Sequence, residues 1–127
     1  MKAFNEFRTW ALVTGAASGL RRIYSKRLAQ MGDNIIMVDI NAAGLQETES
    51  MVKAEVEAAR TLAIVQDLSV PDAAEKIFAA TEAAGCDVEV LVNNAGVMYC
   101  QGIAETSERM LNIIMMVHMY TPLMLCW

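Results

Sequence analysis

The sequence predicts an α/β fold, in which an open sheet of parallel strands carries helices on both faces. Four short apolar runs predict the strands, and they begin 24 to 27 residues apart. Polar residues or glycine bound each run, and none alternates strictly, as expected of strands covered on both faces. The runs are Ala11–Val13, Ile35–Val38, Leu62–Val65 and Val88–Val92.

The first two segments between these runs have helix signals. One helix is predicted from about Gly19 to Met31, with Gly32 as the glycine that ends it. A second helix follows Asn41, a residue suited to the N-cap position. Its apolar residues fall on one face, namely Leu45, Val52 and Val56.

Two further helices complete a β-α-β-α-β-α-β-α order. The third has Pro71 near its first turn and stops at Gly85. The fourth opens near Thr106 or Ser107 and takes in a methionine-rich tail. The expected buried face of the third helix is Ala74, Ile77, Phe78 and Thr81.

Composition narrows the class of protein. The 127 residues, 55% of them hydrophobic and 20% charged, predict one globular domain over residues 1–127. A net charge of -5 argues against a nucleic-acid partner and a cationic membrane-surface protein. Three cysteines without a CxxC pair predict free thiols in a reducing compartment, and with no secretory signal the protein is expected to be cytoplasmic. One histidine and scattered cysteines give no metal-ligand spacing.

The apolar tail from Met110 to Trp127 could be interpreted as a membrane span. Polar residues and a proline interrupt it, whereas a span needs about 20 predominantly apolar residues. We therefore expect a helix buried in a core or in a subunit interface, and no membrane.

A glycine-rich turn, TGAASGL, links the first strand to the first helix over residues 14–20. Gly15 permits a tight turn out of the strand, and Gly19 lets the backbone approach a pyrophosphate closely. The helix that follows points its unpaired N–H groups at that phosphate. Placed between a strand and a helix, this turn predicts a dinucleotide site.

Three other strands end in residues that fit such a site. Asp39 closes the second strand 20 residues beyond Gly19, where a carboxylate reaches the adenosine ribose hydroxyls. Because it would repel a 2′-phosphate, it favours NAD over NADP. Asp67 ends the third strand and the sequence NNAG, residues 93–96, ends the fourth. Open α/β sheets bind ligands at these carboxyl ends.

Over roughly residues 8 to 126, these motifs resemble the short-chain dehydrogenase/reductase family, whose sheet is of the Rossmann-like, doubly wound kind. The resemblance implies that Asp67 holds the adenine amino group beside the Leu68 backbone. It also implies that Asn93, Ala95 and Gly96 line the adenosine ribose and support the strand. Ser18 stands where NADP-preferring members often carry a basic residue. The predicted cofactor-binding residues are Gly15, Ser18, Gly19, Leu20, Asp39, Asp67, Leu68, Asn93, Ala95 and Gly96.

Two departures from the family pattern leave questions open. Arg21 replaces a third glycine of the turn, so its side chain could reach solvent, reach a phosphate or occlude the site. His118 replaces an asparagine that the family uses in a proton relay. The Pro122 ring lacks the N–H that would bond the His118 carbonyl, and that carbonyl could hold a water instead.

A third departure concerns the chemistry itself. The resemblance implies a catalytic serine and a Tyr-x-x-x-Lys pair, and neither is found. Tyr24, Tyr99 and Tyr120 are followed four residues on by Leu28, Ile103 and Met124. We therefore expect a fold truncated after the fourth strand and its helix, and a chain that is inactive by itself.

The favoured function is an NAD(P)-dependent oxidoreductase fragment that keeps the cofactor motifs, with an alcohol or carbonyl substrate only in a full-length version. The alternative is a non-catalytic nucleotide-binding or self-associating module. A methyltransferase on a similar sheet is disfavoured by NNAG and by Asp67-Leu68. Homo-oligomer formation, first of all as a two-fold dimer, is expected through the C-terminal helix. The exposed edge of the fourth strand makes strand-edge pairing an alternative, and exchange of the tail between chains is another. The helix residues expected at that contact are Met110, Ile113, Ile114, Val117, Leu123 and Leu125.

Overall fold

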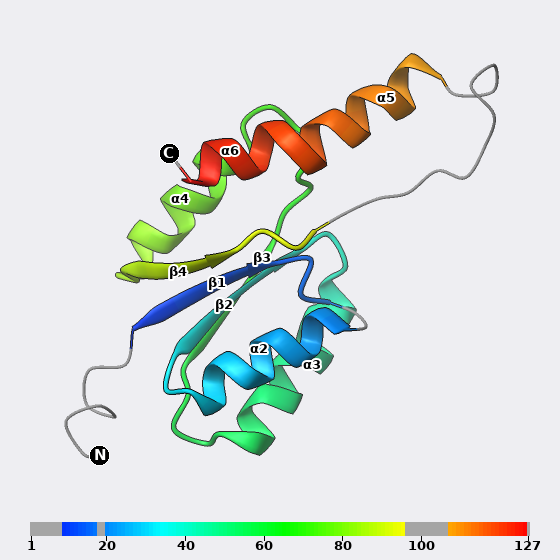
Figure 1. The fold of residues 1–127 in the computed structure, drawn as a ribbon. Helices are drawn as coiled ribbons and strands as arrows, with labels where there is room; N and C mark the ends of the chain where they lie inside the picture. Colours follow the sequence, from blue (N-terminus) through cyan, green and yellow to red (C-terminus); the bar gives the residue numbers. More distant parts are fainter. Residues whose placement is uncertain (1–8, 18–19, 96–106, 127) are drawn as a thin grey trace.

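The computed structural model describes residues 9–17, 20–95 and 107–126, and its centre is a four-stranded parallel sheet (Figure 1). The strand order is β3-β2-β1-β4, so β4 lies at one edge. β2 pairs in register with β1 and with β3, whereas the pairing of β1 with β4 has one register shift between Trp10 and Ala11. The chain passes β2 and β1 on its way from β3 to β4. The strands are β1 (Trp10–Thr14), β2 (Asn34–Asp39), β3 (Thr61–Val65) and β4 (Val88–Val92).

Helices cover both faces of this sheet, as the sequence predicts. Helices α2 and α3 lie on one face, and α4 with the C-terminal helical run lies on the other (Figure 1). Asn41 caps α3 by accepting a hydrogen bond from the Gly44 N–H, and Ser107 caps α5 in the same way through the Met110 N–H. The helices are α2 (Leu20–Gln30), α3 (Ala42–Glu55), α4 (Ala73–Ala83), α5 (Glu108–Met115), a π-helical turn (Met116–Tyr120) and α6 (Thr121–Cys126).

The sheet divides the core into two layers because successive side chains of a strand point to opposite faces. Ala11 and Val13 of β1 pack toward α2 and α3, together with Leu45 and Val52. Leu12 of the same strand faces the other layer, where it joins a cluster with α4 and the C-terminal run. This arrangement leaves the carboxyl ends of all four strands at one edge of the molecule.

The structure sets the start of α4 and corrects one expectation about its faces. Pro71 lies two positions before the first helical residue, near the first turn as predicted, since Asp72 is the N-cap and Ala73 opens the helix. Phe78 is 62% exposed, whereas Ala74, Ile77 and Thr81 are buried as predicted. Phe78 lies beside a hollow next to the edge strand β4, where no further element of the described chain covers it.

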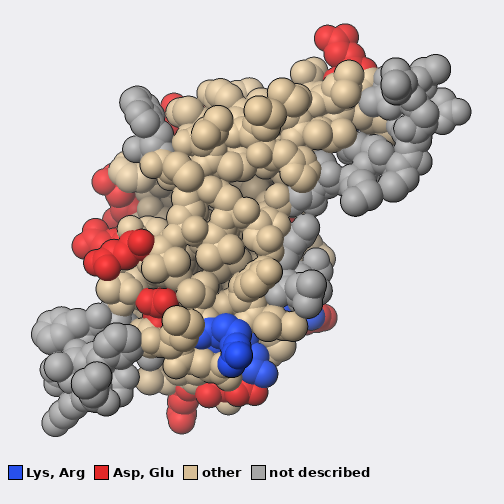
Figure 2. All heavy atoms as spheres, in the orientation of Figure 1, with Lys and Arg blue, Asp and Glu red and all other residues tan. Residues whose placement is uncertain are grey.

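Most of the C-terminal helical run is exposed in the single chain. Among residues 108–126 only Val117 and Thr121 are buried, so a core helix, the first of the two expected settings, is wrong, and the subunit interface stays a prediction. The run Glu108–Cys126 is also long and apolar enough to cross a membrane, a property that core helices of soluble proteins share. On the face shown in Figure 2, it carries charged atoms only at its far end.

Candidate functional site

A pocket of about 260 Å³ opens at the carboxyl ends of the strands. It lies between β1 and β4, two neighbouring strands that are followed by helices on opposite faces of the sheet. Open α/β sheets bind their ligands at such a point. Five predicted residues meet there, namely Gly15, Asp39, Asp67, Leu68 and Ala95. Ile40, Gln66, Ser69, Ile113 and Val117 complete the lining.

Gly15 begins the turn with a left-handed backbone, φ 68°, which glycine adopts without a steric penalty. Its N–H donates to the Val38 carbonyl at 2.7 Å, and the Ala16 N–H donates to the same oxygen at 3.2 Å. Both bonds tie the turn to the end of β2. The sequence of the turn thus produces a chain reversal fixed next to Asp39.

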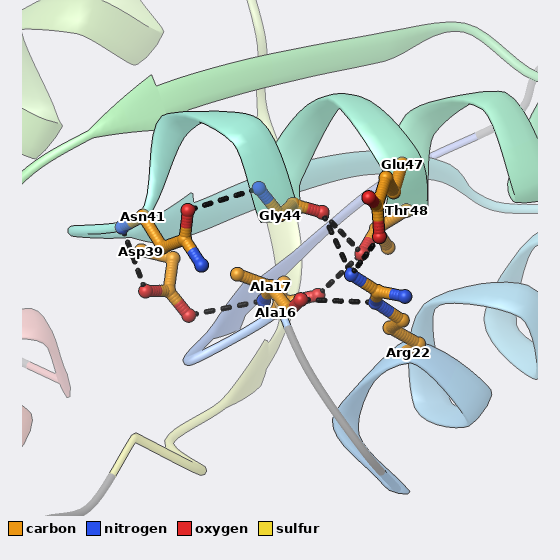
Figure 3. Close-up of polar contacts among 8 residues, drawn as sticks. All are labelled: Ala16, Ala17, Arg22, Asp39, Asn41, Gly44, Glu47 and Thr48. Atoms are coloured by element: carbon orange, nitrogen blue, oxygen red, sulfur yellow. Dashed lines mark hydrogen bonds and ion pairs between the residues drawn. The ribbon is translucent and has the colours of Figure 1, made fainter.

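Asp39 lies at the end of β2 with both carboxylate oxygens in use (Figure 3). Oδ2 accepts a hydrogen bond from the Ala17 N–H at 3.0 Å, and Oδ1 accepts one from the Asn41 N–H at 3.0 Å. An ionised carboxylate offers about four lone-pair sites. Asp39 therefore keeps acceptor capacity for a ligand hydroxyl while the protein holds its orientation.

Asp67 and Leu68 form the wall of the pocket after β3. Asp67 Oδ1 accepts hydrogen bonds from the Ser69 N–H at 2.9 Å and from Ser69 Oγ at 2.7 Å. The second carboxylate oxygen accepts no hydrogen bond from the residues that the structure describes, and it lies on the same wall as Leu68, which is 7% exposed. This wall combines one acceptor group with an apolar side chain, a combination that suits a flat heterocycle with an amino group.

The segment after β4 is anchored by Thr14, a residue that the sequence reasoning did not single out. Its buried hydroxyl accepts hydrogen bonds from the Asn94 N–H at 2.9 Å and the Ala95 N–H at 3.1 Å. Ala95 is thereby held against the pocket. Asn93 instead faces the C-terminal run, where its Nδ2 lies 3.4 Å from the Pro122 carbonyl oxygen.

Some predicted residues lie outside the part of the chain that the structure describes. They are Ser18, Gly19 and Gly96, together with the side chains of Leu20 and Arg21. Their assignment to the cofactor remains a sequence-based prediction.

Sequence reasoning also missed the contacts that Arg22 and Gly44 make with the glycine-rich turn (Figure 3). Arg22 Nε donates to the Ala17 carbonyl at 2.9 Å, and its Nη2 forms an ion pair with Glu47 at 2.8 Å. Gly44 lets α3 approach closely, because a Cβ there would lie 2.8 Å from both Ala17 Cβ and the Ala17 carbonyl oxygen. The sequence marks these contacts only by the gathering of basic residues at Arg21, Arg22, Lys26 and Arg27.

Comparison with known proteins places this geometry in a family context. Residues 9–127 match the model of the family described as short chain dehydrogenase. A diacetyl reductase that forms (S)-acetoin, from Staphylococcus epidermidis, is 37% identical over 115 residues, which are 89% of this chain and 43% of that protein.

Solved structures agree with the sequence comparison. A 7beta-hydroxysteroid dehydrogenase superposes with a TM-score of 0.86 at 26% identity, covering 97% of this chain and 48% of that one. A metagenomic short-chain oxidoreductase in complex with NADP superposes with a TM-score of 0.81 at 26% identity, covering 92% and 52%. The chain thus spans about half the length of the relatives it matches.

Proposed function

The chain belongs to the short-chain dehydrogenase family, and we propose that its 127 residues are the nucleotide-binding part of an NAD-dependent oxidoreductase. The observation that carries this proposal is the pocket at the carboxyl ends of the strands, where Gly15 and Asp39 lie beside Asp67 and Leu68. The family binds a nicotinamide dinucleotide, and the two carboxylates of this pocket are acceptors suited to the hydroxyl and amino groups of its adenosine end.

The residues present fit an adenosine. Asp39 is oriented by two backbone N–H groups and retains lone pairs for ribose hydroxyls. Gly15 presents no side chain to the pocket, so a ligand can approach the backbone closely. Asp67 and Leu68 line the side that would accept the adenine. In the same proposal Ala95 and Gly96 line the ribose, and Asn93 supports the end of the strand through its contact with the Pro122 carbonyl. Ser18, Gly19 and Leu20 are assigned to the pyrophosphate.

We assign a preference for NAD over NADP to Asp39. A 2′-phosphate bound at this ribose would lie next to a carboxylate, and like charges a few ångströms apart repel by several kcal/mol near a protein surface, about 4 kcal/mol at 4 Å. The NADP complex of the metagenomic relative shows that related proteins accept the phosphate. The proposed preference is therefore assigned to Asp39 and not to the family, and it can be measured.

Titration calorimetry of the purified chain with NAD and with NADP tests the proposal. We expect NAD to bind at least about tenfold more tightly, and Asp39→Asn to lose most of this difference because it removes the repelling charge. Asp72→Asn is the matched control, since Asp72 pairs with the exposed Lys76 on α4 and is not among the residues lining the pocket. Binding of neither nucleotide, or NADP affinity equal to that of NAD, would contradict it.

The proposed role in the reaction is limited to the cofactor. We find no Tyr-x-x-x-Lys within the 127 residues, so we assign no catalytic residue to them. A complete protein with these residues would transfer hydride between the nicotinamide and an alcohol or carbonyl substrate. The alternative is a non-catalytic module that binds a nucleotide or associates with itself. Tight NAD binding by the 127 residues alone would fit both an oxidoreductase part and a non-catalytic nucleotide-binding module.

We also propose that the domain is cytoplasmic and pairs with a second copy through the C-terminal run. Four exposed apolar residues of that run form a stripe, with one residue at every fourth position. They are Leu111, Met115, Met119 and Leu123. Three of the helix residues that the sequence predicts at the contact between copies pack against the domain's own core instead. They are Ile113, Val117 and Leu125.

A further inference from the structure

We propose that Thr48, a buried residue of α3 outside the pocket, is a positioning residue for the carboxylate of Asp39. The two side chains lie on opposite sides of one peptide unit of the glycine-rich turn (Figure 3). The carbonyl oxygen of Ala16 accepts a hydrogen bond from Thr48 Oγ1 at 2.8 Å. The N–H of Ala17 donates to Asp39 Oδ2 at 3.0 Å.

The carbonyl that Thr48 binds and the N–H that Asp39 binds belong to the same rigid peptide plane. The Ala16 carbonyl and the Ala17 N–H share one peptide bond, which is planar and trans, so they point in opposite directions. Rotation of this plane would remove the N–H from Asp39 and the carbonyl from Thr48 together. The hydroxyl of Thr48 therefore holds the N–H that orients the carboxylate in the pocket.

The buried environment of Thr48 makes its hydrogen bond to the Ala16 carbonyl costly to lose. Its side chain is fully buried, so water does not replace a lost hydrogen bond to the Ala16 carbonyl. The same hydroxyl lies 3.0 Å from the Gly44 carbonyl, one turn earlier in α3. Because a hydroxyl has one proton, these two carbonyls share a single donor.

Arg22 and Gly44 fix the other end of the turn. Arg22 Nε donates to the Ala17 carbonyl at 2.9 Å, so both carbonyls of residues 16 and 17 are held from the protein side. Gly44 brings α3 within contact of Ala17, which sets the distance that the Thr48 hydroxyl must span. Thr48 thus couples the position of α3 to the ligand-facing carboxylate.

The test compares Thr48→Val, which keeps the shape but removes the hydroxyl, with Thr48→Ser, which keeps the hydroxyl. Thr81→Val is the matched control. Thr81 is also buried, and its hydroxyl donates to the Phe78 carbonyl of its own helix at 2.8 Å, but it lies in α4, away from the turn. Thermal unfolding of each variant shows that it folds and how much stability it loses.

The first readout needs no ligand. Hydrogen exchange of the Ala17 amide, followed by NMR under conditions where every variant is folded, reports whether its bond to Asp39 persists. We expect exchange on the order of tenfold faster in Thr48→Val, with near wild-type exchange in Thr48→Ser and in Thr81→Val. Unchanged protection in Thr48→Val, or an equal loss in Thr81→Val, would overturn the proposal.

The second readout rests on the proposed NAD binding. Thr48→Val is expected to weaken NAD affinity about three- to tenfold, the range of one hydrogen bond, while Thr48→Ser retains it. In an Asp39→Ala background the same change should have little further effect, because no side-chain acceptor is left there for the Ala17 N–H to orient. Additive losses would overturn the link. If the wild-type chain binds no NAD, the proposed function fails, and the Ala17 exchange still decides the role of Thr48.

Discussion

The hydroxyl of Thr121, in α6, donates a 2.7 Å hydrogen bond to the backbone carbonyl of Leu68, in the segment after β3. Both residues are buried, and they lie 53 positions apart in the chain. Leu68 lines the pocket together with Ile113 and Val117, which precede Thr121 in the same helical run. The C-terminal run therefore forms part of the pocket wall as well as an exposed apolar stripe.

Thr121→Val should destabilise the domain by about 1–3 kcal/mol, because it leaves a buried carbonyl without its donor. It should also weaken nucleotide binding, since the backbone at Leu68 is no longer held against the pocket. Urea denaturation measures the first effect and calorimetry the second. Thr121→Ser is the control that keeps the donor, and equal losses in both variants would show that the hydroxyl has no such role.

The purified 127-residue chain should show no dehydrogenase turnover. The pocket holds Asp39 and Asp67, and neither has a partner among the described residues that would make it an acid–base catalyst for a carbonyl. The measurement is cofactor oxidation or reduction with a panel of alcohols and carbonyl compounds. A rate that Asp39→Ala abolishes and Asp72→Asn leaves intact would contradict this expectation.

Self-association should depend on the stripe of the C-terminal run. At about 25 cal/mol per Å², burial of roughly 500 Å² of such surface is worth on the order of 12 kcal/mol before association costs. Met115→Glu places a charge in the centre of the stripe and should shift the chain to monomer in sedimentation at micromolar concentration. Met31→Glu, at another exposed methionine at the end of α2, is the control. A wild-type chain that stays monomeric and soluble would refute this proposal.

The thiol of Cys86 should react more slowly than that of Cys126. Burial raises the pKa of Cys86, a shift that nearby Arg60 opposes and Asp87 reinforces. Cys126 is free and exposed. At about pH 8, where the thiolate is the reactive form, alkylation followed by peptide mapping should modify Cys126 first. Faster modification of Cys86 in the folded chain would be the contrary result.

The same shift gives a pH dependence of stability with a defined sign. A raised pKa means that the unfolded chain loses the Cys86 proton at a lower pH than the folded chain does. The contribution of this residue is therefore complete below the ordinary cysteine pKa, about 8.5, and is lost as pH rises through the folded value. Cys86→Ala should flatten the alkaline part of the stability curve measured by urea denaturation.

The family assignment and the order of elements were available from the sequence. The four strands lie within one residue of the predicted runs, and Asn41 and Ser107 cap the helices that they were expected to open. These features rest on hydrogen bonds and side-chain spacing within a few residues, so a local pattern determines them. The strand-end positions of Asp39 and Asp67 follow from the same local reasoning.

The tertiary structure alone decided how the turn is held and which side of the last helix is exposed. Thr48 reaches Ala16 across 32 positions, and Thr14 reaches Ala95 across 81, so no local pattern marks either contact. The C-terminal run is apolar on several sides, and only its packing on the sheet shows that Val117 faces the core and Met115 faces outward. Local spacing determines where a helix begins and which residues share a face. The burial of that face depends on which distant segment packs against it.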